Sequence, residues 1–310
     1  MKKIVMLIAT AVMTVSVASA QDINAVTDTY NNAATQLDID KVEALSLFQQ
    51  ALSEAEAVGD LGIEIADQCK AIIPQLMISI AKDELRDSKF DEAYDLLIKA
   101  GEAAELYGNP DKAAEANALV NQALMQKANA YLNAKDFTNA VLVYEQLMAL
   151  DATNANAALR LGQCYASLGN NAKAEEVLLV AAANGQEKQA NKLLSNIFVK
   201  ESQNAYKAKQ FQEAIDFAVK SNGYLENANA YKLAGQAAFG LGKNAEALPF
   251  LEKYVELAPN AKDAAQMKYN IAATAQKLGD KEKAKAYYEQ VLADPKFGPS
   301  AKQQLDALNK

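Results

Sequence analysis

The chain has 310 residues, of which 51% are hydrophobic, so it carries enough apolar side chain to bury a sizeable core. It contains no histidine, which excludes Ser-His-Asp and Cys-His catalytic groups and an HExxH zinc site. Its 39 acidic residues outnumber 31 basic ones, and only Arg86 and Arg160 are arginine. An acidic, arginine-poor chain is a poor binder of nucleic acids.

The first twenty residues have the pattern of a secretory signal peptide. Lys2 and Lys3 precede an apolar run at 4–17, and residues 18–20 (Ala-Ser-Ala) match the small-x-small cleavage pattern. The run is shorter than the roughly 20 residues that span a bilayer, so cleavage after Ala20 is favoured over a permanent anchor. No cysteine lies near this site, so we expect no lipoprotein. These features predict a bacterial protein of the Gram-negative periplasm, or a secreted one, with no membrane span after cleavage.

Residues 21–120 are expected to form divergent, longer copies of a helical repeat. Asp40 and Glu43 have the spacing of a capping box that opens a helix. Pro110 precedes a long helical pattern, and the first turn of a helix tolerates proline. Strand signals are nearly absent from the chain, which predicts an all-α fold.

Residues 121–298 hold the clearest copies of this repeat. Each of four copies has a small residue on a first helix, an alanine twelve residues later, and a larger apolar residue four beyond that. Helical spacing keeps these side chains on one face, and a Gly, Asn, Asp or Lys turn between them reverses the chain. The small residues are Ala128, Gly162, Gly235 and Ala272, and the larger apolar residues are Tyr144, Leu178, Leu251 and Tyr288. A single hairpin of this kind cannot bury its apolar face, so consecutive copies must stack.

The second-helix alanine recurs at intervals of 49, 47, 34, 40, 33 and 37 residues. Its positions are Ala44, Ala93, Ala140, Ala174, Ala214, Ala247 and Ala284. The pattern resembles that of the tetratricopeptide repeat (TPR) family, whose unit is a 34-residue helix–turn–helix. The resemblance implies a right-handed α-solenoid of about seven TPR-like repeats. Residues 299–310 are expected to form a capping helix over the last repeat.

The two cysteines, Cys69 and Cys164, are separated by two to three repeats. Each layer of packed helices adds about 8–10 Å, whereas a disulfide needs Cα atoms within about 7 Å. Two buried free thiols are therefore favoured, although an exported chain can form disulfides.

The TPR resemblance implies a concave groove, lined by the first helix of each repeat, that binds peptides or partner helices. The residue after each small core residue would face this groove, and these residues are Asn129, Gln163, Gln203 and Gln236. A row of amides can hydrogen-bond an extended backbone. The other groove candidates are Met125, Leu132, Leu159, Tyr206, Lys232, Phe239 and Tyr269. The alternative that these amides are ordinary surface residues stays open.

The resemblance thus implies an exported, non-catalytic scaffold or adaptor that binds a protein or peptide, with no cofactor, catalytic residue or metal site. Carboxylate pairs occur at helical spacing in many places, and no pair stands out as an acid–base site. The alternative is a cell-envelope protein that binds or senses a small ligand such as a glycan or peptide fragment. The acidic net charge favours a basic or neutral partner. A homo-oligomer formed through exposed end repeats stays open.

Overall fold

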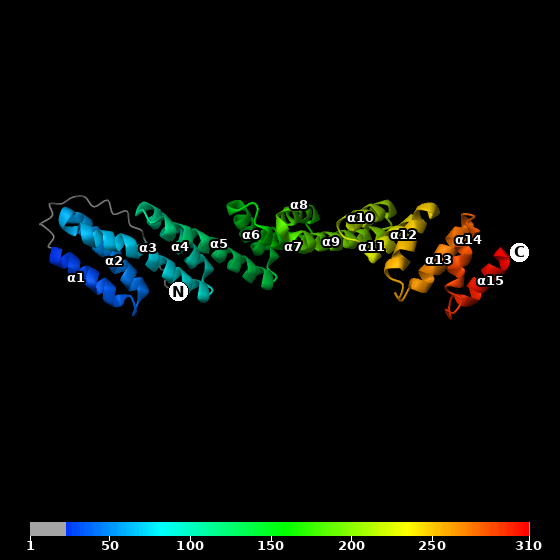
Figure 1. Cartoon of the computed structure of the whole chain (residues 1–310), viewed down its shortest axis with the longest axis horizontal. Coiled ribbons are helices and arrows are strands. Elements are labelled where there is room, and N and C mark those ends of the chain that lie inside the picture. The colour runs from blue at the N-terminus through cyan, green and yellow to red at the C-terminus, as the bar shows by residue number, and fades with distance from the viewer. Residues whose placement is uncertain (1–22, 310) are drawn as a thin grey trace. The chain divides into compact units, whose positions relative to one another are not determined.

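The computed structural model describes residues 23–309, and every regular element in that range is a helix. The all-α prediction is thereby confirmed. Along the described chain, α1–α4 form two helix–turn–helix pairs and α7–α14 form four, with α5 and α6 between them in sequence and α15 after them (Figure 1). The chain divides into two compact units, an N-terminal unit that ends at Asn129 and a C-terminal unit that begins at Ala130. The predicted signal peptide lies outside the described residues.

The N-terminal unit consists of two hairpins and most of a fifth helix. Within it α2 packs against α1 and α3, and α3 packs against α4. A 3-10 turn, η1 (Gly59–Gly62), joins the two hairpins. Glycine is required at Gly62 because a Cβ atom there would lie 2.1 Å from the carbonyl oxygen of Ala55. The helices are α1 (Ile23–Gln36), α2 (Lys41–Ala57), α3 (Ile63–Arg86), α4 (Phe90–Leu106) and α5 (Pro110–Asn133).

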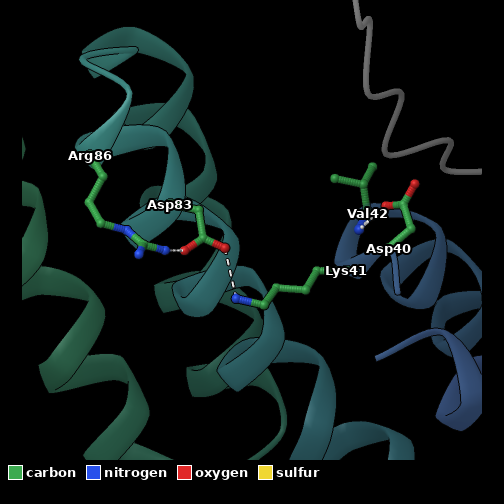
Figure 2. A network of polar contacts seen from close by, with 5 residues as sticks. All are labelled: Asp40, Lys41, Val42, Asp83 and Arg86. Atoms are coloured by element: carbon green, nitrogen blue, oxygen red, sulfur yellow. Dashed lines mark hydrogen bonds and ion pairs between the residues drawn. The ribbon is translucent and has the colours of Figure 1, made fainter. Parts of the chain in front are cut away.

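Helix α2 begins at the predicted N-cap. The Asp40 carboxylate accepts a hydrogen bond from the backbone N–H of Val42 at 2.9 Å (Figure 2). It accepts a second from the backbone N–H of Glu43 at 3.1 Å. The reciprocal half of a capping box is not formed, because the Asp40 N–H donates to the carbonyl of Gln36 at 2.8 Å. Asp40 therefore ties the end of α1 to the start of α2.

The C-terminal unit contains four further hairpins, preceded by α6 and followed by α15. Helix α8 runs into α9 through a π-helical turn, η2 (Ala182–Gln186), in which Gly185 adopts a φ of 98°. The helices are α6 (Phe137–Leu150), α7 (Ala155–Ser167), α8 (Asn171–Ala181), α9 (Glu187–Lys207), α10 (Phe211–Tyr224), α11 (Ala228–Gly240), α12 (Asn244–Leu257), α13 (Ala264–Lys277), α14 (Lys281–Glu289) and α15 (Gly298–Leu308). Helix α15 covers the last hairpin, since Ala301 is part of the same apolar cluster as Ala284 and Tyr288.

The repeat pattern in the sequence correctly predicts which residues are buried in the core. All seven of the predicted second-helix alanines are fully buried. A Cβ atom on Gly162 would lie 2.5 Å from Leu178, and one on Gly235 would lie 2.5 Å from Leu251. The small residue of the first helix therefore lies directly against the larger apolar residue that follows it by sixteen positions. This contact brings the two helices of each of these hairpins close together.

Within residues 23–309, six of the seven turns between a first and a second helix contain one residue in the left-handed conformation, and the α1–α2 turn contains none. In three of these turns this residue is glycine, and in three it carries a side chain, although left-handed backbone is costly for such residues. The residues and their φ angles are Ser88 (61°), Lys135 (60°), Gly169 (79°), Lys209 (60°), Gly242 (73°) and Gly279 (86°). These residues occupy equivalent positions, so they align one repeat with another.

Both cysteines are buried free thiols, as predicted. Burial raises the pKa of Cys69 and of Cys164 to about 11, so both thiols stay protonated at neutral pH. No helix in the range 23–309 has the length and apolar character needed to cross a bilayer. The same residues contain no group of three Cys, Asp or Glu side chains suited to holding a metal ion.

Candidate functional site

A pocket of about 520 Å³ lies between α7 and α9 in the C-terminal unit. We call it the α7–α9 pocket. Both helices are first helices of their hairpins, and the turn between α7 and α8 contributes Gly169 to the lining. It is lined by Gly162, Gln163, Ala166, Ser167, Gly169, Asn171, Leu193, Asn196, Ile197, Lys200, Glu201 and Asn204.

The lining side chains combine amide groups with apolar surface. The Oε1 atom of Gln163 accepts a 3.4 Å hydrogen bond from Arg160, and its amino group makes no hydrogen bond among the described residues. Asn171 donates to Glu201 at 2.9 Å. Asn196 and Asn204 make no hydrogen bond among the described residues through their side chains, and each can donate and accept. The pocket therefore offers amide donors and acceptors beside the aliphatic side chains of α9.

The four predicted amides are not gathered in this pocket. Gln163 lines it, whereas Gln203 is exposed on α9 and lies outside the lining. Gln236 is half-buried on α11. Asn129 is half-buried on α5 and ends the other unit. Only one member of the predicted row therefore contributes to the pocket, and binding by the other members stays a prediction.

The predicted aromatic residues pack within the protein. Tyr206 contacts Phe211, with ring centroids 5.6 Å apart. The ring of Tyr269 lies 5.4 Å from that of Tyr288. Phe239 packs against two clusters of buried residues. The three remaining apolar candidates are half-buried on α5 and α7, and they are Met125, Leu132 and Leu159.

Lys232, the predicted groove cation, is paired inside the C-terminal unit. Its Nζ lies 3.0 Å from the Asp263 carboxylate and 5.3 Å from the centre of the Tyr254 ring. Burial opposes ionisation of Asp263, but hydrogen bonds from Tyr254 and Lys232 outweigh it and lower the pKa of that carboxyl. Burial and the bond to Asp263 raise the pKa of Tyr254 to about 12. The cluster ties α11 and α12 to the start of α13.

Sequence reasoning missed the α9 side of the pocket. Its members recur every three or four residues on one face of the helix, from Leu193 through Asn196 and Lys200 to Asn204. That periodicity is visible in the sequence. The sequence-based prediction instead uses the residue after each small core residue, which is Gln203 on α9, together with the positions four before and three after it, such as Tyr206.

Comparison with protein families covers most of the C-terminal unit. Three tetratricopeptide repeat models match residues 131–197, 199–262 and 265–293. The chain belongs to the tetratricopeptide repeat family. The TPR matches include both helices of the α7–α9 pocket. The TPR family is typically non-catalytic. Membership in it supports the role of a protein-interaction scaffold for this chain.

Solved structures of TPR proteins are similar to this chain at low sequence identity. A crystal structure of MamA is 20% identical over 54% of this chain and 92% of its own, with a TM-score of 0.34. The structure described as "YrrB: a TPR protein with an unusual peptide-binding site" is 21% identical over 62% of this chain and 97% of its own, with a TM-score of 0.35. A comparison with curated protein sequences found no match. Likeness at this level says nothing about function.

Proposed function

We propose that the chain is an exported, non-catalytic TPR scaffold that binds a segment of a partner protein in the α7–α9 pocket. The observation that carries this proposal is the lining of the pocket, where three amides with unused hydrogen-bonding groups lie beside aliphatic side chains. Gln163, Asn196 and Asn204 can bond the backbone of an extended segment, which has a donor and an acceptor at each residue. Leu193 and Ile197 supply apolar contact for its side chains.

A small-ligand role is less well supported by the packing of the aromatic residues. A glycan-binding groove is expected to present exposed aromatic faces, but Tyr206 and Tyr269 direct their rings at other aromatic rings of the protein. Neither residue lines the α7–α9 pocket.

The exported location rests on the sequence pattern of residues 1–20. We expect the mature protein to begin at Gln21 and to fractionate with the periplasm or the medium. Amino-terminal sequencing of protein recovered from each fraction tests this. A mature chain that keeps Met1 and stays with the membrane would contradict it.

The binding proposal is tested by capture of partners from a periplasmic extract. The variant Gln163→Ala/Asn204→Ala removes two amides from the pocket, and Gln189→Ala/Gln290→Ala is the matched control, because these two exposed amides of the same unit lie outside the lining. We expect the pocket variant to lose a partner that the wild type and the control both retain, while all three give the same circular dichroism melt. Retention of every partner by the pocket variant would refute this site.

A further inference from the structure

A second pocket, of about 610 Å³, lies within the N-terminal unit between α3 and α5. We call it the α3–α5 pocket. Like the α7–α9 pocket, it is formed by two successive first helices. It is lined by Lys41, Ser79, Lys82, Asp83, Leu85, Arg86, Leu119, Gln122 and Gln126.

The charge of this lining is opposite to that of the unit around it. Residues 23–129 contain eight basic and 19 acidic residues, a formal charge of −11. Three of the eight basic residues, Lys41, Lys82 and Arg86, line the pocket, against one acidic residue, Asp83. Charges more than about 10 Å away are largely screened at 0.1 M salt, so a bound segment experiences the local cations more strongly than the net charge of the unit.

The one carboxylate of the lining already has two cationic partners. One Asp83 oxygen lies 2.7 Å from the Nζ of Lys41, and the other pairs with a terminal nitrogen of Arg86 (Figure 2). Asp83 therefore holds Arg86 in place without cancelling the positive charge of the pocket. The Arg86 side chain remains 74% exposed, so its other nitrogens are accessible to a ligand.

Lys82 shares its counter-ion with another lysine. Glu115 lies 2.8 Å from Lys82 through one oxygen and 2.8 Å from Lys112 through the other. Hydrogen bonds from Lys112 and Lys82 lower the pKa of Glu115, so this carboxyl is ionised at neutral pH. A single negative charge thus serves two lysines, and one of these, Lys82, lines the pocket half-exposed.

The donors lie along two facing stripes. Lys82 and Arg86 are four residues apart on α3, and Gln122 and Gln126 are four residues apart on α5, so each pair shares a helix face. Among the described residues, neither glutamine side chain makes a hydrogen bond. Cations on one wall and amides on the other can hold a segment that offers both carboxylates and a peptide backbone.

We propose that the α3–α5 pocket binds an acidic peptide segment, with Lys82 and Arg86 contacting its carboxylates and Gln122 and Gln126 its backbone. This inference rests on the proposed function, that the chain binds partner segments in such grooves, and it adds the chemical class of one partner. It also reverses, for this pocket, the basic or neutral partner that the net charge predicts.

The test is fluorescence anisotropy of the mature chain at 100 mM salt with a labelled ten-residue peptide of alternating glutamate and alanine. An analogue with glutamine in place of glutamate measures the contribution of charge. We expect the wild type to bind the glutamate peptide about ten-fold more tightly than the analogue, as two partly exposed charge pairs would give. In Lys82→Gln/Arg86→Gln this preference should disappear.

The matched control is Lys70→Gln/Lys89→Gln, which removes the same charge from ion-paired residues of the same unit outside the pocket. It should keep the preference, and all variants should show the same melting curve. If the control loses the preference for the glutamate peptide to the same extent, the proposal is overturned. It is also overturned if inorganic phosphate displaces the peptide as readily as unlabelled peptide does. If the glutamate peptide shows no preference while partner capture still depends on Gln163, this inference fails and the proposed function stands.

Discussion

The α3–α5 and α7–α9 pockets occupy the same place in two repeats but differ in charge. The left-handed turn residues align them, because Ser88 follows α3 as Gly169 follows α7. On that alignment Lys82 corresponds to Gln163, and Arg86 corresponds to Ser167. One helical scaffold therefore presents a cationic wall in the N-terminal unit and a neutral, amide-bearing wall in the C-terminal unit.

The net charges of the two units differ in the opposite sense from the charges of their pockets. The N-terminal unit carries a formal charge of −11, whereas residues 130–309 have 20 basic and 19 acidic residues, a charge of +1. The net charge of a unit is thus a poor guide to its groove. The charge of a groove is set by the few residues that the first helices of neighbouring repeats direct toward one another.

The largest expected effect on stability comes from the glycine that lies where α7 and α8 are close together, Gly162. The C-terminal unit has Gly162 where the N-terminal unit has Ala81, and a Cβ atom on Gly162 would lie 2.5 Å from Leu178. We expect Gly162→Ala to destabilise the C-terminal unit by about 1–3 kcal/mol through overpacking. Thermal and urea melts followed by circular dichroism measure this.

The control for that change is Gly223→Ala. Gly223 lies within α10, and a Cβ atom there would meet nothing within 4 Å. This substitution should stabilise the protein by about 0.5–1 kcal/mol, because alanine is the better helix former. A Gly162→Ala protein that melts like Gly223→Ala would show that the first and second helices of this hairpin are not closely packed.

An internal carboxylate should make the C-terminal unit sensitive to acid. Burial opposes ionisation of Glu175, but hydrogen bonds from Lys220 and Tyr224 outweigh it and lower its pKa. A carboxyl with a lowered pKa stabilises the fold above its unfolded pKa of about 4.3, and this contribution is lost as the pH falls through the folded value. We expect Glu175→Gln to cost about 1–2 kcal/mol at pH 7, as for other hydrogen bonds to charged groups.

Urea unfolding between pH 7 and pH 3 measures this contribution. The difference between the wild type and Glu175→Gln should shrink as the pH falls below the unfolded pKa. Glu176→Gln is the control, because Glu176 is the exposed neighbour on α8. A difference that stays constant down to pH 3 would assign the loss to packing instead of charge.

Exchanging turn residues between the units should give opposite effects. Ser88 has a φ of 61° in the turn where the other repeat has Gly169, with a φ of 79°. Ser88→Gly should stabilise the N-terminal unit and Gly169→Ser should destabilise the C-terminal unit, each by about 1 kcal/mol. Melting curves of the two variants and of the double exchange measure this. Shifts of the same sign would contradict it.

Transfer of the cations should have the smallest effect, a few-fold change in affinity. Gln163→Lys/Ser167→Arg places the charges of the α3–α5 pocket at the corresponding positions of the α7–α9 pocket. We expect the C-terminal unit to gain binding of the glutamate–alanine peptide, measured in a Lys82→Gln/Arg86→Gln background. Gln189→Lys/Gln290→Arg adds the same charge elsewhere and should give no gain. An equal gain in this control would show non-specific attraction.

The sequence predicts the helical hairpins well because their signal is repeated. The alanine of each second helix is fully buried, from Ala44 to Ala284, since only a small residue fits where the helices are close. The cap at Asp40 is also predictable, because it depends on residues two and three positions away. The η2 turn, which lengthens the interval between Ala174 and Ala214, has no comparable signal.

The pockets are less predictable because they depend on pairs of helices. Lys82 and Arg86 lie on α3, in the divergent region, and on a sequence alone they look like cations of a solvated helix face. Their role depends on the position of Gln122 and Gln126 on another helix. Lys232 shows the converse, because its pairing with Asp263 joins residues 31 positions apart.

The Lys41–Asp83–Arg86 contact gives the α3–α5 pocket an internal competitor. An incoming carboxylate must share Arg86 with Asp83, a ligand that the protein carries at high effective concentration. Asp83 also anchors Lys41, at the first residue of α2, to α3. The same side chain therefore sets an upper limit on affinity and holds two hairpins together. A variant that removes Asp83 in order to tighten binding should therefore also destabilise the fold.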